Sequence, residues 1–286
     1  MSAAATVGKR GRDQLPLVFP ALMLFAFFVV PFGLMIAVSF FERVQGGFYV
    51  PVFTTANYAR FLSLFFGEIL LFSLALSALV SAICLTVGAP FTYLLTKLPR
   101  RRQVPWLVAM LAVLSLSEVI IGFAWSTLLS RTAGVSNLLA AIGLMDGPDA
   151  WSPSFGAVLA GMVYQALPYA VLVLYPSFSR LDPSLAEAAR TLGASPARSF
   201  LTVILPAMRT TLIATFIIVF VFALGAYLLP QLLGRPQHWT LSVLITDQAI
   251  YQSNMPFAAA MAVFLVIASL LLVLLTTVLG HKGKPA

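Results

Sequence analysis

Side chains that commonly carry catalysis or bind metals are scarce in this 286-residue chain. Its single cysteine, Cys84, cannot form a disulfide within the chain, and its two histidines, His238 and His281, lie far apart in the sequence. A metal or acid–base centre needs several such groups close together. The phosphate-binding pattern G-x-x-x-x-G-K-[ST] does not occur either. We therefore expect no catalytic residue, no metal and no cofactor here, and any ATP and magnesium must be bound by another subunit.

One ionisable side chain, Glu118, interrupts the otherwise uncharged stretch 104–130. A carboxylate in the bilayer core costs about 2.5–3.5 kcal/mol on insertion scales, so it is expected to face a helix bundle or water. Gln165 falls at a similar depth in another apolar stretch. Our hypothesis is that Glu118 and Gln165 line a midplane constriction, where a negative charge favours a cationic solute. The alternative is a structural glutamate bonded to Ser115, to Ser117 or to the backbone of an adjacent helix.

The composition indicates that these residues are held in a membrane. Hydrophobic residues make up 60% of the chain and charged residues only 9%, whereas a soluble domain carries about 25% charged residues. This excess of apolar side chains excludes a soluble globular protein and a disordered one.

Six apolar stretches are each long enough to cross a bilayer once, since a core about 30 Å thick needs about 20 helical residues. Backbone groups in lipid must be bonded within their own segment, and no strand alternation is visible, so helices are expected rather than a barrel. The predicted fold is all-α, with one transmembrane domain over residues 15–280. Its six spans are expected at about 15–41, 69–96, 104–130, 155–179, 210–234 and 255–280.

Basic residues indicate the orientation of these spans. Of the 17 lysines and arginines, 13 fall in the tails 1–14 and 281–286 and in the second and fourth connections. The positive-inside rule then places both termini in the cytoplasm. We expect lipid rather than nucleic acid around the chain. The first apolar stretch is too long for a cleavable signal peptide and predicts an uncleaved helix.

The fourth connection, 180–209, predicts ordered structure instead of a simple loop. Asp182-Pro183 matches a helix N-cap followed by the favoured first-turn proline. Gly193 suits the left-handed position that ends a helix, and Ser195-Pro196 repeats the start signal for a second helix running toward Leu205-Pro206. Such a helix–turn–helix either lies on the membrane surface or acts as a rigid lever that another protein pushes.

The spacing in this connection resembles the EAA loop of ABC importer permeases, whose pattern is E-A-A-x3-G-x9-I-x-L-P. Here Glu187, Ala188, Ala189, Gly193, Leu205 and Pro206 match it, and Val203 replaces the isoleucine. The resemblance implies a cytoplasmic coupling helix that contacts the ATPase through these residues.

Three further stretches resemble the spermidine/putrescine branch of that family. They begin at Gly88 in the second span, at Tyr164 in the fourth and at Ala223 in the fifth, and the last contains Tyr227, which we expect on the translocation path. The third span departs from the branch, because it reads SLSEVIIG over 115–122 where relatives often carry a polar, aromatic-rich stretch with an arginine.

The resemblance implies a non-enzymatic permease subunit of an ATP-driven importer in the bacterial inner membrane, for a small, polyamine-like cation. Its implied partners are a pair of cytoplasmic ATPase subunits, a second, non-identical permease and an extracytoplasmic solute-binding protein. The alternative is a stand-alone secondary transporter driven by an ion gradient, which usually shows inverted repeats and broken midplane helices. The outer connections carry aromatic residues such as Trp151 and Trp239, which either anchor the chain at the interface or form a docking surface.

Overall fold

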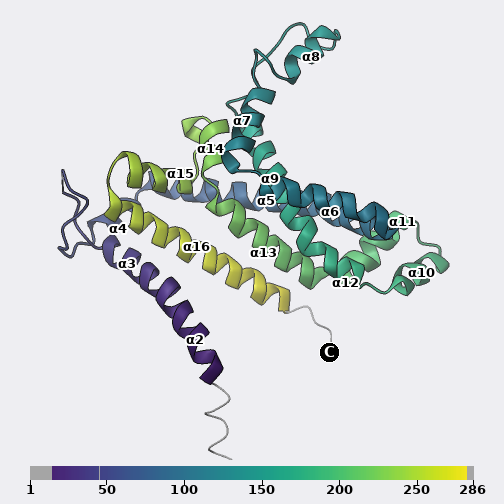
Figure 1. The fold of residues 1–286 in the computed structure, drawn as a ribbon, viewed down its shortest axis with the longest axis horizontal. Helices are drawn as coiled ribbons and strands as arrows, with labels where there is room; N and C mark the ends of the chain where they lie inside the picture. The colour runs from purple at the N-terminus through teal and green to yellow at the C-terminus, as the bar shows by residue number, and fades with distance from the viewer. Residues whose placement is uncertain (1–14, 45, 282–286) are drawn as a thin grey trace, which may run out of the picture. The chain divides into compact units, whose positions relative to one another are not determined.

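The structure is a computed structural model that describes residues 15–44 and 46–281. The predicted tail 1–14 lies outside the described residues, as does all of the predicted tail 281–286 except His281. Within the described part the chain is helical, with one isolated antiparallel bridge between Glu42 and Val50. It divides into two compact units (Figure 1), the first reaching to Ser63 and including Asp247–Phe264, and the second comprising Leu64–Thr246 and the chain from Leu265 onward.

The first unit begins with an apolar helix that changes its winding before a proline. It runs through α2 (Leu15–Leu24), a π-helical turn η1 (Phe25–Val29) and α3 (Val30–Ser39). Pro31 cannot donate to the carbonyl of Phe27, and the Val30 N–H bonds one residue further back, to the carbonyl of Phe25.

Aromatic contacts and hydrogen bonds hold the rest of this unit together. The short helix α4 (Ala56–Phe61) stacks Phe61 on Phe264 of α16 (Met255–His281), with ring centroids 4.1 Å apart. The guanidinium of Arg60 lies 4.3 Å from the ring centroid of Phe257. In the sequence, the π-helical turn η4 (Asp247–Tyr251) comes just before α16 and leads into Gln252. The Gln252 carbonyl accepts a 2.6 Å hydrogen bond from the Arg43 side chain.

The core of the second unit lies between three apolar helices, α5 (Leu64–Lys97), α9 (Phe155–Ser179) and α13 (Arg209–Gly225). Leucine, valine, alanine and the single cysteine fill this core, among them the fully buried Val80, Cys84 and Val219. The remaining helices of the unit are α6 (Arg100–Ser115), α7 (Glu118–Leu128), α8 (Val135–Ala141), α10 (Pro183–Thr191), α11 (Pro196–Ser199), α12 (Leu205–Ala207), α14 (Leu228–Leu233), α15 (Leu241–Thr246), with the π turn η2 (Phe200–Ile204) and the 3-10 turn η3 (Pro236–His238).

A row of serines on α5 allows close packing in this core. Ser73, Ser77 and Ser81 are buried, and each hydroxyl bonds to the carbonyl four residues earlier on the same helix, at 2.7–2.8 Å. The hydroxyls are thereby satisfied without water, as buried polar groups in a membrane must be. Small residues of this kind let neighbouring helices approach closely.

Among the described residues, four helices are long and apolar enough to cross a membrane, and the number rises to six if each of two bent pairs is one span. The pairs are α6 with α7, bent by 99°, and Pro196–Ala207 with α13, bent by 78°. The prediction of a continuous third helix over 104–130 is therefore wrong, since Leu116 and Ser117 are extended. The predicted fifth helix over 210–234 is also interrupted, because α13 ends at Gly225 and α14 begins at Leu228.

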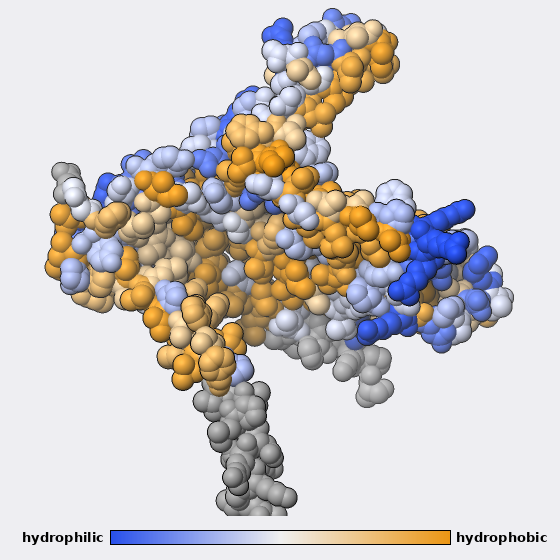
Figure 2. Space-filling model, in the orientation of Figure 1, coloured by the Kyte–Doolittle hydropathy of each residue, from blue (hydrophilic) through white to orange (hydrophobic). Residues whose placement is uncertain are grey.

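Hydrophilic residues gather at one end of the second unit. Figure 2 shows them where α6 begins and where α10 and α11 lie, whereas hydrophobic residues cover much of the side of the helices. Arg100, Arg101 and Arg102 stand at the start of α6, and Arg190 and Arg198 belong to α10 and α11. Charged residues at one end and apolar sides are the distribution expected of a helix bundle in a bilayer.

Candidate functional site

The connection between α9 and α13 forms a capped helix with an ordered turn. The side chain of Asp182 accepts a 2.9 Å hydrogen bond from the Ser184 N–H, and Pro183 occupies the first turn of α10. Ser195 caps α11 in the same way, through a 3.3 Å bond from the Arg198 N–H. The local structure predicted from these two Asx/Ser-Pro pairs is confirmed.

Gly193 lies at the turn between α10 and α11 in the left-handed conformation, with φ of +85°. Its N–H bonds to the carbonyl of Arg190, and the Ala194 N–H bonds to that of Ala189, so that two end carbonyls of α10 are satisfied. A side chain at position 193 would meet no neighbour within 4 Å, so the glycine is required by backbone conformation and not by space.

Within α10, the three motif residues face different surroundings. Glu187 and Ala188 are exposed, while Ala189 is only 8% exposed. Leu185 and Leu192 are also exposed, the latter to 89%. Because large apolar side chains at an uncovered helix end are costly in water, this end has the character of a contact surface.

The rest of the motif joins this surface to the membrane helices. Ile204 is fully buried in a cluster with Ala89 of α5 and Leu174 of α9, and Leu205 packs on its edge while Pro206 stays exposed. Pro206 cannot donate to the carbonyl four residues earlier, and the preceding turn η2 is a π-helix. The loop is therefore anchored on the ends of α5 and α9.

A cluster of three aromatic rings reinforces that anchor. The ring of Tyr93, near the end of α5, lies 6.0 Å from the ring of Phe178 on α9 and 5.2 Å from that of Phe200 in η2. The ammonium of Lys97 lies 5.1 Å above the Tyr93 ring. The rings of α5, α9 and η2 thus form one packed cluster.

Glu118 is the first residue of α7, not a mid-helix residue as the continuous span implied. Just before it, the Ser115 hydroxyl bonds back to the Leu111 carbonyl at 2.9 Å, a bond that tends to bend helices. A carboxylate in the first turn of a helix also interacts favourably with the helix dipole. Glu118 is thus favourably placed to begin a new helix after the break at Leu116–Ser117.

Glu118 lies on the packed side of α7, next to α14. Glu118, Ile121, Gly122 and Trp125 form one stripe of α7 at helical spacing, and Ile121 and Gly122 are buried. The backbone N–H of Leu229 in α14 interacts with the Glu118 carboxylate. The Oε1 atom of Glu118 is buried and has no hydrogen-bond partner among the described residues.

Tyr227 lies at the second break, as the N-cap residue of α14, and its side chain is 39% exposed. The break follows from Pro230, which lacks the N–H that would bond to the Ala226 carbonyl and whose ring would clash with it. Two hydroxyls near the start of α15 replace the lost bonds. Ser242 donates to the Leu224 carbonyl at 2.6 Å and Thr240 to the Ala226 carbonyl at 3.4 Å.

The segment that carries these hydroxyls is itself fixed to α5. The Leu241 N–H donates a 2.8 Å hydrogen bond to the Ser73 hydroxyl. Just before α15, His238 accepts from the Arg235 N–H through Nδ1, at 3.3 Å, and partial burial together with the Arg235 charge lowers its pKa. This outer connection is thus partly buried structure. Its sequence signals are Pro230 and the hydroxyls of Thr240 and Ser242.

Two glycines allow α14 to pack between α7 and α9. A side chain at Gly122 would come within 2.6 Å of Leu232, and one at Gly161 would come within 2.6 Å of Leu233. Leu229 lies close to both glycines. Therefore α7, the second half of one broken span, packs directly against α14, the second half of the other.

Gln165 lies half-buried on α9, and no hydrogen bond joins it to Glu118 in the described part of the chain. Beside it, Tyr164 is 37% exposed and contacts Trp125 of α7 edge to face, with centroids 5.7 Å apart. The shared polar constriction remains a hypothesis. No group of three or more His, Cys, Asp or Glu side chains able to hold a metal occurs among the described residues.

The helices, their breaks and the anchored loop define a multi-pass α-helical membrane protein. Residues 14–282 match the family described as binding-protein-dependent transport system inner membrane component, and the chain belongs to this family. It is therefore a multi-pass inner-membrane protein and a permease subunit of an ABC importer, a transport subunit and not an enzyme.

Curated relatives support this assignment. The chain is 32% identical over 254 residues to the spermidine/putrescine transport system permease protein PotB of Salmonella typhimurium (strain SL1344), covering 89% of this chain and 88% of the relative. It is equally identical over 253 residues to PotB of Escherichia coli (strain K12), covering 88% and 91%.

Solved structures share the fold. A bacterial ABC transporter that imports the acidic polysaccharide alginate matches with a TM-score of 0.78 at 17% identity, covering 97% of this chain and 98% of that one. The alginate transporter in complex with a pentasaccharide-bound periplasmic protein matches with a TM-score of 0.74 at 18% identity, covering 96% of each chain.

Proposed function

We propose that α10 is the coupling helix of this permease and that it docks on a cytoplasmic ATPase through Glu187, Ala188, Ala189 and Gly193. The observation that carries the proposal is the geometry of this loop: a capped helix, exposed on one side and anchored by Ile204 and Leu205 on the other. A helix fixed at its base and uncovered at its end can pass a displacement into the membrane helices. Both termini and this loop then lie in the cytoplasm, in agreement with the distribution of basic residues.

The remaining partners follow from the same assignment. The chain pairs with a second, non-identical permease, two ATPase subunits supply ATP and magnesium binding, and a solute-binding protein delivers the cargo from outside. The binding-protein complex of the alginate transporter supports the last partner. ATP binding closes the ATPases and moves α10, and the permease pair exchanges inward for outward access because its two states bind these partners with different affinities.

The proposed cargo is a small polyamine-like cation. The names of the 32% identical relatives support this class. Gln165 is half-buried and the rings of Tyr227 and Tyr164 are partly exposed, and aromatic faces attract ammonium groups. Of the two roles open for Glu118, its interaction with Leu229 favours the structural one.

Uptake by the assembled transporter in proteoliposomes tests the proposal. The full-length chain is purified with its co-purifying subunits, and radiolabelled putrescine or spermidine is supplied with the binding protein. We expect uptake only with ATP on the ATPase side. Uptake driven by an ion gradient without ATP would instead support the secondary-transporter alternative.

A paired substitution separates coupling from folding. We expect Glu187→Arg to abolish ATP-driven uptake, because it reverses the charge of an exposed side chain on α10, while the protein stays folded. Arg101→Glu, a charge reversal at an exposed position of α6 outside this loop, is the control and should retain most uptake. Equal losses in both variants would contradict a specific role for Glu187.

A further inference from the structure

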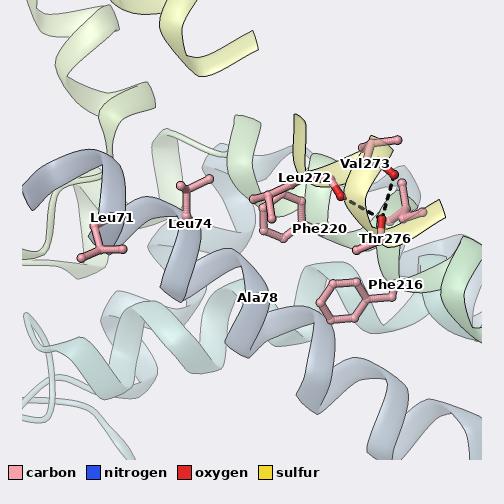
Figure 3. A pocket seen from close by; sticks show the side chains of 9 residues that line it. Leu71, Leu74, Ala78, Phe216, Phe220, Leu272, Val273 and Thr276 are labelled. Atoms are coloured by element: carbon pink, nitrogen blue, oxygen red, sulfur yellow. Dashed lines mark hydrogen bonds between the residues drawn. The ribbon is translucent and has the colours of Figure 1, made fainter. Parts of the chain in front are cut away.

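An apolar groove opens on the second unit between α5, α13 and α16, with a volume of about 360 Å³. Leu71, Leu74 and Ala78 come from α5, Phe216, Ile217 and Phe220 from α13, and Leu272, Val273 and Thr276 from α16. Figure 3 shows these side chains along the three helices, eight of them labelled. None of them belongs to the coupling loop or to the two helix breaks.

The lining offers no polar group to a ligand. Thr276 is the one hydroxyl, and it bonds to the carbonyls of Leu272 and Val273 on its own helix, at 2.9 Å each (Figure 3). Phe216 and Phe220 lie nearly parallel, with centroids 6.2 Å apart, and form a flat wall. An occupant must therefore be a hydrocarbon.

The shape of the lining favours a flexible chain over another helix. Helices pack in membranes through small residues, which let their backbones approach. Here Ala78 and Thr276 are the two small side chains, whereas Leu71, 68% exposed, and the two phenylalanines are bulky. A rigid helix would be held away by these side chains, while a thin acyl chain can follow the space between them.

Positive charge lies toward one end of the groove. Arg209, the first residue of α13, precedes Phe216 by seven residues and Phe220 by eleven, a spacing that places all three on one helix face. Seven residues correspond to about 10 Å along a helix, and half of a bilayer core is about 15 Å. The long Arg209 side chain can therefore reach headgroup level on the side that carries most basic residues.

An apolar groove that leads toward the cationic Arg209 complements an amphipathic molecule with an anionic head. Anionic phospholipids of the cytoplasmic leaflet have this chemistry.

We propose that this groove binds one acyl chain of an anionic phospholipid from the cytoplasmic leaflet, with its phosphate near Arg209. The site is independent of the cargo path and of the ATPase contact. It makes the chain sensitive to the lipid composition of the inner leaflet.

Native mass spectrometry of the full-length protein tests the acyl-chain site. The probes are phosphatidylglycerol and phosphatidylcholine, titrated in mild detergent. Ala78→Trp fills the groove and should remove the tightest phosphatidylglycerol adduct, while Leu79→Trp, on an exposed position of α5 outside the groove, should keep it. Retention of that adduct by Ala78→Trp, or its equal loss in both variants, would overturn the proposal.

Arg209 tests the headgroup contact separately. Near a membrane surface one arginine contributes about 1 kcal/mol of attraction to anionic lipid, a factor of about five. We expect Arg209→Gln to reduce the preference for phosphatidylglycerol over phosphatidylcholine by about fivefold and to leave phosphatidylcholine binding unchanged. An unchanged preference would contradict the placement of the phosphate.

Photocrosslinking distinguishes a lipid from a second polypeptide. Because Cys84 is buried, a cysteine introduced as Ile217→Cys can carry a photoreactive probe selectively. In the transporter extracted from its own membranes, the expected product is heavier by one phospholipid. A product heavier by another protein chain would show that a neighbouring subunit covers the groove.

Discussion

Asp182 and Glu118 are carboxylates with opposite exposure. Asp182 is exposed and caps α10, whereas Glu118 is half-buried at the start of α7. The sequence predicted the first correctly, because Asp-Pro before a helical pattern indicates a local structure. For Glu118 the apolar run concealed the helix break, and its partner Leu229 lies 111 residues away in the chain.

Glu118→Gln separates the two roles of that carboxylate. If Glu118 holds α7 against α14, the amide oxygen still accepts from Leu229, and the half-saturating concentration of a cationic cargo should change by less than about twofold. Glu118→Leu, which removes the acceptor, should lower the thermal stability of the chain in nanodiscs. A more than tenfold loss of cargo affinity in Glu118→Gln alone would instead place the charge on the path.

The Asp182 cap should make α10 pH-dependent. The hydrogen bond from the Ser184 backbone, followed by its side chain, lowers the pKa of Asp182 in the folded loop. The cap therefore stabilises α10 above the ordinary carboxyl pKa of about 3.9, and this contribution is lost as pH falls through the lower folded value. Amide exchange of α10, corrected for intrinsic rates, should accelerate over that range.

Asp182→Asn provides the control for this pH effect, because asparagine also caps helices but does not titrate. Exchange of α10 in Asp182→Asn should show no corresponding acceleration. The Ser195-capped helix α11 supplies an internal reference in the same protein. If both helices respond equally to acid in the parent chain, titration of Asp182 is not the cause.

Among the elements, the α10–α11 turn could be predicted in detail and the two broken spans could not. Caps, prolines and Gly193 act within a few residues, so their signals are local. The break after Gly225 depends on Pro230, but its stability depends on hydroxyls of a distant segment, Thr240 and Ser242. Hydropathy cannot detect it, because both halves of the span are equally apolar.

Gly193→Ala should weaken the coupling turn. Its φ of +85° costs an L-residue about 1–2 kcal/mol, and no contact compensates for that cost. We expect lower protection of α10 in amide exchange and less uptake per ATP hydrolysed. Gly147→Ala, at a glycine with open space and no left-handed φ, should leave both unchanged. Equal effects of the two substitutions would contradict the conformational explanation.

Ser242→Ala should destabilise the break between α13 and α14. It leaves the buried Leu224 carbonyl without its 2.6 Å hydroxyl bond, at a cost of about 1–3 kcal/mol. Thermal unfolding in nanodiscs measures this loss. Thr246→Ala is a matched control, since the Thr246 hydroxyl bonds only to a carbonyl of its own helix, and it should cost less.

For the whole molecule, the sequence supported the class of fold because lipid imposes simple requirements. Charge-free stretches predict where helices run, and basic residues predict which ends face the cytoplasm. The share of each span that is buried differs widely, from half of the window in Phe155–Ser179 to none in Phe19–Ser39. That difference depends on tertiary packing, and the hydropathy of the two stretches does not reveal it.

Orientation of the whole chain can be measured with cysteines. Cys84 is buried, so an impermeant maleimide reports only on cysteines that are added. With 13 of 17 basic residues on one side, we expect Gly147→Cys to label in intact spheroplasts and Ala197→Cys to label only after the membrane is opened. The reverse pattern would place α10 outside, where no cytoplasmic ATPase could reach it. Because the coupling proposal requires α10 inside, this one measurement bears on the topology and on the mechanism together.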